Sequence, residues 1–181
     1  MKTKAWFVSN FSGYLEKITK QSIRADFYLF TAILLVGSLL YHVSYLIQKV
    51  HTSPVDVLNP GSMIVLTLMT VFLFIYNGII FLLAISLAEH FFVLFISDKP
   101  DFEKTMKSVI YASFLPVLFL WIPSVFHIPC SALVLVGAYT IITFYGIRIF
   151  HGVTVDRAAF VAIFTTGCIL ILLYFGNVNL L

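Results

Sequence analysis

Long uninterrupted runs of apolar residues dominate the chain. A membrane-spanning helix needs about 20 predominantly apolar residues, and five segments reach about that length. These predicted spans cover residues 27–47, 63–96, 108–127, 130–149 and 158–175. Strands of a membrane barrel alternate apolar and polar positions over about ten residues, and these runs do not alternate. The pattern therefore predicts an all-α membrane protein, with one domain over residues 27–181 built as a bundle of five transmembrane helices.

The second run is longer than an ordinary span. Residues 63–96 would rise about 50 Å as one helix, against a hydrocarbon core about 30 Å thick. Two spans do not fit, because Asn77–Gly78 is the only interruption and no polar turn divides the run. We expect one long, tilted helix whose end, near Glu89 and His90, lies at the interface or beyond it. The alternative is a helix followed by an interfacial segment.

Composition and charge support a membrane protein and give it an orientation. The chain is 61% hydrophobic and only 10% charged, whereas soluble domains have about 25% charged residues. With five spans and the N-terminus in the cytoplasm, Lys49 alone lies outside, which is the bias expected of inner loops. The basic residues placed inside are Lys2, Lys4, Lys17, Lys20, Arg24, Lys99, Lys104, Lys107, Arg148 and Arg157. The net charge of +3 therefore reflects topology in the cytoplasmic membrane, with the C-terminus outside, and not nucleic-acid binding.

The N-terminal stretch, residues 1–26, has its own pattern. Apolar residues recur at spacings of three and four between lysines, as in an amphipathic helix. They are Trp6, Phe7, Phe11, Tyr14, Leu15 and Ile18. Such a helix either lies on anionic lipids of the inner leaflet or packs on the cytoplasmic face of the bundle.

Ionisable residues are predicted to gather at the inner membrane face. They are Glu89 and His90, ending the second span, Arg148 and His151, ending the fourth, and Asp156 and Arg157, opening the fifth. Charged groups at this depth are costly unless paired, so the simplest interpretation is an ion pair between Glu89 and Arg148. A partner or lipid-headgroup site is a second interpretation. A metal or proton site built from Glu89, His90, His151 and Asp156 is a third.

Two prolines mark the third span. Pro116 and Pro123 each remove a backbone donor and kink a helix, which either shapes the packing or lines a transport route. Small residues such as Gly137 and Gly146 favour close contacts between helices. No phosphate-binding loop, zinc helix or nucleophile elbow is present in the sequence, so we expect no catalytic residue, no cofactor and no metal centre.

Two stretches carry a resemblance to a known family. One is Tyr111-Ala112-Ser113-Phe114-Leu115-Pro116, and the other is Gly146-Ile147-Arg148-Ile149-Phe150-His151-Gly152-Val153-Thr154, followed by Asp156-Arg157-Ala158-Ala159. With His90 before the charged loop, they resemble the Yip domain family, five-span membrane proteins named for members that bind Ypt/Rab GTPases. The resemblance covers residues 60–181 best and implies a membrane-embedded scaffold without enzyme chemistry. Eukaryotic members have a long polar N-terminus, which the short stretch here does not match, so the resemblance implies a compact prokaryotic-type relative.

Two functions follow as hypotheses. The first is an integral membrane scaffold of the Yip type, whose partners are the bilayer and an unidentified membrane or cytoplasmic protein. The sequence leaves a homo-oligomer open. The second is a small transporter or channel that uses the kinked third span and the inner polar residues. The predicted midplane holds few polar residues, namely Asn77, Thr140 and Thr143, and this scarcity favours the scaffold.

Overall fold

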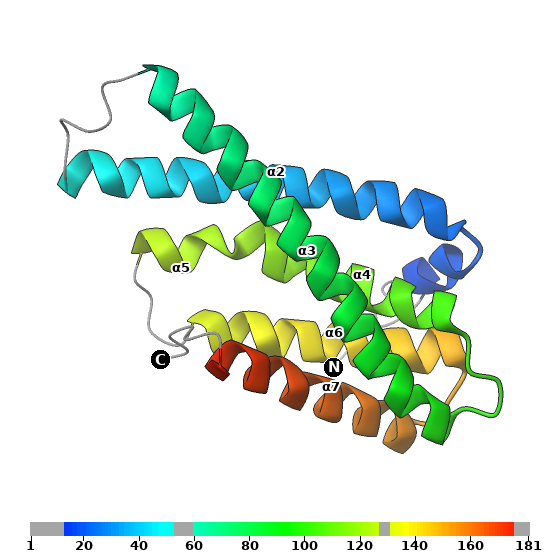
Figure 1. Cartoon of the computed structure of the whole chain (residues 1–181). Coiled ribbons are helices and arrows are strands. Elements are labelled where there is room, and N and C mark those ends of the chain that lie inside the picture. Colours follow the sequence, from blue (N-terminus) through cyan, green and yellow to red (C-terminus); the bar gives the residue numbers. More distant parts are fainter. Residues whose placement is uncertain (1–12, 53–59, 127–130, 176–181) are drawn as a thin grey trace.

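The computed structural model describes residues 13–52, 60–126 and 131–175, and these form a bundle of α-helices (Figure 1). A short helical segment over residues 13–19 comes first. The helices that follow are α2 (Ile23–Thr52), α3 (Pro60–Ile96), α4 (Phe102–Phe119), α5 (Trp121–Phe126), α6 (Ser131–His151) and α7 (Val155–Phe175). The predicted all-α class is thus confirmed over the described residues. Residues 127–130, around the boundary of the predicted third and fourth spans, lie outside them.

Four of these helices are long and apolar enough to cross a membrane, namely α2, α3, α6 and α7. The fourth helix of the bundle, α4, begins with charged residues, Glu103, Lys104 and Lys107. The prediction of one helix over 108–127 was wrong in its bounds, because Asp101 caps a helix that begins at Phe102 and Leu120 separates α4 from α5. Figure 1 shows α4 and α5 following one another across the bundle between α2 and α6. The helices therefore establish four candidate spans and leave the five-span count unconfirmed.

The long second run forms one continuous helix, α3, of 37 residues. At about 1.5 Å per residue it is roughly 55 Å long, far more than a hydrocarbon core of about 30 Å. Figure 1 shows it crossing the bundle obliquely, and tilting is one way in which a helix longer than the bilayer is accommodated. Gly78 does not break it; a Cβ there would stand 2.5 Å from the side chain of Leu34. The glycine thus lets α2 and α3 approach closely.

The bundle exposes apolar side chains on its outside and buries polar ones inside. Large exposed residues run along α3 and α6, for example Ile64, Leu68, Phe72 and Val134. An apolar surface of this extent is typical of a protein surrounded by lipid and would be a liability in water. The four candidate spans and this surface together make the chain an integral membrane protein.

One end of the bundle carries nearly all the basic residues. Here α2 begins, α3 ends, α4 begins, α6 ends and α7 begins (Figure 1). Every described lysine and arginine except Lys49 lies in a segment at this end, and we call it the basic end. The charge asymmetry read from the sequence is therefore present in the fold.

Candidate interaction site

A buried threonine ties three helices together at the basic end. The Oγ1 atom of Thr105 lies 3.1 Å from Nδ1 of His90 on α3 and 3.1 Å from Nε2 of His151 on α6. It also donates to the carbonyl of Asp101, at 3.2 Å. A hydroxyl donates once and accepts twice, so at least one of the two histidine nitrogens donates to it. His90 and His151, both predicted as site residues, are thus connected through Thr105, which the sequence analysis did not identify.

Local structure explains why Thr105 sits there. Asp101 is the N-cap of α4, with its carboxylate accepting from the amide of Glu103 at 3.0 Å, an arrangement that stabilises a helix start. Phe102 packs its ring against that of His90, with centroids 5.2 Å apart. Gly152, with φ of 62°, follows His151 directly and lets the chain reverse toward α7. The helix cap at Asp101, the ring contact of Phe102 and the turn at Gly152 together place His90 and His151 beside the hydroxyl of Thr105.

The predicted ion pair between Glu89 and Arg148 was wrong. Glu89 is completely buried, where its Oε2 accepts a 3.5 Å hydrogen bond from the hydroxyl of Tyr139 and Ser108 lies beside it. Arg148 is exposed, and the ion pairs found among the described residues do not include it. The reason is helical phase: the buried face of α6 carries Tyr139, Gly146 and Ile147, and Arg148 projects away from that face.

The remaining predicted residues lie at the surface of the basic end. Asp156 and Arg157 are both exposed in the first turn of α7. Arg157 donates to the carbonyl of Ile96 at 2.8 Å and so caps the C-terminus of α3. Among the residues that the structure describes, no group of three or more His, Cys, Asp or Glu is placed to hold a metal ion. The metal interpretation of Glu89, His90, His151 and Asp156 therefore finds no support in their placement.

The prolines have separate positions. Pro116 lies inside α4, four residues before the interruption at Leu120, and lines a cavity between the helices. Pro123 lies within the short helix α5. A break between two prolines fits the expected kink, because each proline removes a backbone donor from the helix.

A second buried network at the basic end was missed by sequence reasoning. The hydroxyl of Tyr111 donates to Asp26 at 2.6 Å, and the ammonium of Lys107 lies 3.9 Å from the same carboxylate. Lys107 also donates to the carbonyl of Gln21 at 2.5 Å and pairs with Glu103 at 3.2 Å. Glu103, Lys107 and Tyr111 are spaced four apart, so they lie on one face of α4. That spacing was the available signal, and it was lost because the predicted span began only at Ser108.

The N-terminal segment packs against this network. Leu15 and Ile18 are buried in the main hydrophobic cluster of the bundle, which also contains Tyr111. The ring of Tyr14 meets that of Tyr111 edge to face, with centroids 6.5 Å apart. Of the two expectations for this stretch, packing on the bundle holds for residues 13–19. Trp6, Phe7 and Phe11 lie outside the described residues.

These features define the class of protein. It is an all-α integral membrane protein in which two buried polar networks hold the helices together at the basic end. A model of the Yip1 domain matches residues 12–176. The chain belongs to the Yip1 domain family, as the resemblance in its sequence suggested. Comparison with curated proteins and with solved structures gave no match. Three residues that carried the resemblance, His90, Tyr111 and His151, take part in the two networks.

Proposed function

We propose that this protein is a membrane-embedded scaffold of the Yip type, which binds a partner at its basic end and carries no catalysis of its own. The proposal rests on one observation: at the basic end the helices are joined by buried hydrogen bonds, while the surface carries exposed positive charges. Thr105 fixes α3, α4 and α6 to one another, while Lys99, Lys104 and Arg148 remain exposed. Fixed positive side chains on a rigid base suit an acidic partner surface, because little ordering is needed on binding.

The proposal includes a topology of five crossings. In it α4 and α5 together form the third span, since they cross the bundle one after the other (Figure 1). The basic end faces the cytoplasm by the positive-inside rule, and the N-terminus lies inside. Cytoplasmic-membrane location of a prokaryotic type is part of the same proposal, as is contact of the basic end with anionic lipids of the inner leaflet.

Reporter fusions test this topology. Fusions at Val55 and after Leu181 should report an external location, and a fusion at Asp101 should report the cytoplasm. Both expectations follow from an odd number of crossings with the basic end inside. A cytoplasmic C-terminus would mean that α4 and α5 do not cross, and the five-span proposal would then be abandoned.

Affinity purification in mild detergent tests the scaffold. Proteins that co-purify with the wild type should be lost when Lys104→Glu and Arg148→Glu are combined, because the reversed charges repel an acidic surface. The matched control is Lys49→Glu, the same change at the opposite end, which should keep them. Equal recovery from all three proteins would overturn an interaction at the basic end.

One observation favours the second candidate, a small transporter or channel. Glu89, Ser108 and Thr143 are all buried, Ser108 lies beside Glu89 and Thr143 beside Tyr139, and a cluster of buried polar groups of this kind calls for an explanation. They come from α3, α4 and α6, the helices that a transport route would pass between. Ion flux into proteoliposomes that is abolished by Glu89→Gln would establish transport, whereas a scaffold would show no flux and would keep its partner in that variant.

A further inference from the structure

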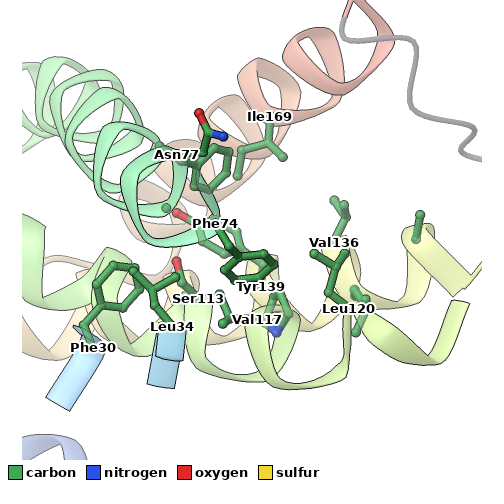
Figure 2. A pocket seen from close by; sticks show the side chains of 15 residues that line it. Phe30, Leu34, Phe74, Asn77, Ser113, Val117, Leu120, Val136, Tyr139 and Ile169 are labelled. Carbon is green, nitrogen blue, oxygen red and sulfur yellow. The ribbon is translucent and has the colours of Figure 1, made fainter. Parts of the chain in front are cut away.

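A cavity of about 360 Å³, open on one side, lies between the helices (Figure 2). Ligand pockets measure about 300–1,000 Å³, so the volume is sufficient for part of a small molecule. Its walls come from α2, α3, α4, α6 and α7. Figure 2 shows Phe74, Val117 and Tyr139 converging on it from three of these helices. A void of this size left empty inside a bundle would be destabilising.

The lining is almost entirely apolar. Its polar members are Asn77, Ser113 and Tyr139, and two of them are already engaged. Ser113 donates to the carbonyl of Val109 at 2.7 Å, and Tyr139 donates to Glu89 at 3.5 Å. The cavity therefore offers hydrocarbon contacts and few groups that would hold water, which needs two to four polar partners.

The cavity lining has a buried part and an exposed part, and the exposed part is its mouth. Phe30, Leu34 and Ile169 are buried, whereas Asn77, Phe81 and Leu120 are exposed. Asn77 and Phe81 stand near the middle of α3, one of the four candidate membrane spans. The mouth therefore opens sideways into the hydrocarbon core and not toward water.

The shape of the recess limits what can occupy it. Its lining covers only residues 74–81 of α3 and 132–139 of α6, about two turns of each helix. A helix of a second copy is about 10–12 Å across and needs a groove along its length. A hydrocarbon chain is far thinner, since carbon atoms pack about 3.5–4.0 Å apart. From these facts we infer that the cavity binds the acyl chain of a membrane phospholipid, which enters from the leaflet at the end of the bundle opposite the basic end, where α6 begins.

Photo-crosslinking in defined vesicles tests this inference. The full-length protein is reconstituted with phosphatidylglycerol that carries a diazirine near the end of one acyl chain, illuminated and digested. In the wild type, cross-links should map to cavity residues that are not exposed, such as Val117, Leu135 and Tyr139. Val136→Trp places a large side chain in the cavity and should reduce these cross-links several-fold.

The matched control is Val134→Trp, two residues away on the same helix, where the side chain is 70% exposed to the outside. It should leave the cavity cross-links at the wild-type level. Ala132→Trp fills the same cavity from a second position and should act like Val136→Trp, which guards against one variant that misfolds. A single symmetric peak on size-exclusion chromatography confirms folding before each experiment.

Two outcomes would overturn the inference. Cavity cross-links that persist in both filled variants would mean that the label reacts from outside the cavity. Cross-links found only on outward residues such as Phe72 and Val134, with a change of oligomeric state in the filled variants, would assign the recess to a second copy of the chain. Loss of cavity cross-links in Val136→Trp and Ala132→Trp, but not in Val134→Trp, supports acyl-chain binding whatever the protein partner is.

Discussion

Replacing Asp26 with alanine should lower the free energy of unfolding by about 3–5 kcal/mol, the usual loss when one member of a buried ion pair is removed. Asp26 is buried and holds two groups of α4: the hydroxyl of Tyr111, and Lys107, which is 3% exposed. Without the carboxylate of Asp26, Lys107 loses its buried counter-charge and retains only a hydrogen bond to the carbonyl of Gln21 and an ion pair with the half-exposed Glu103. Thermal melting in detergent, followed by the loss of soluble monomer, measures the change.

The double variant separates the ion pair from simple packing. Asp26→Ala with Lys107→Met removes both buried charges, and its loss should be clearly smaller than the sum of the two single losses. Asp156→Ala is the matched control, because Asp156 also stands in the first turn of its helix but is exposed. It should barely change the melting temperature. Strictly additive losses would show that Asp26 and Lys107 do not stabilise one another.

The sequence predicted the helices well because the bilayer imposes a length on apolar runs. The predicted spans at 27–47, 130–149 and 158–175 each lie inside or close to an observed helix, α2, α6 or α7. Their ends were misjudged because helices continue past the apolar run. Asp26 and Asp156, for example, sit in the first turns of α2 and α7, where an acid favours the helix N-terminus.

The site was predicted less completely, because tertiary partners are not encoded in spacing along one helix. His90 and His151 were recognised as members of one group, but Thr105, which joins them, resembles an ordinary loop residue in the sequence. Glu89 and Arg148 were paired on their similar expected depth. Depth does not fix the direction in which a side chain points, and Arg148 points outward. Lys107 was placed on the cytoplasmic side, just before the predicted third span, and its partner Asp26 on α2 is far away in the sequence.

Gly146→Leu should be the most damaging change of a single small residue in α6. A Cβ added at Gly146 would stand 2.6 Å from Oγ and 3.2 Å from Cβ of Ser108 on α4. Ser108 is itself buried, so the two helices would have to move apart, and overpacking of this kind costs about 1–3 kcal/mol, occasionally more. The sequence already indicated a close helix contact at this glycine. Detergent melting should show a fall of several degrees.

Gly137→Leu is the matched control, since it makes the same change on the same helix. A Cβ at Gly137 meets no atom within 4 Å, so the side chain has room, and leucine favours a helix more than glycine does. The melting temperature of this variant should stay level or rise.

A further pair of variants locates the clash. Ser108→Ala removes the Oγ atom, so Gly146→Ala combined with Ser108→Ala should be more stable than Gly146→Ala alone. Equal losses at Gly146 and Gly137 would mean that α4 and α6 do not approach at Gly146, and that the damage comes from leucine in α6 itself.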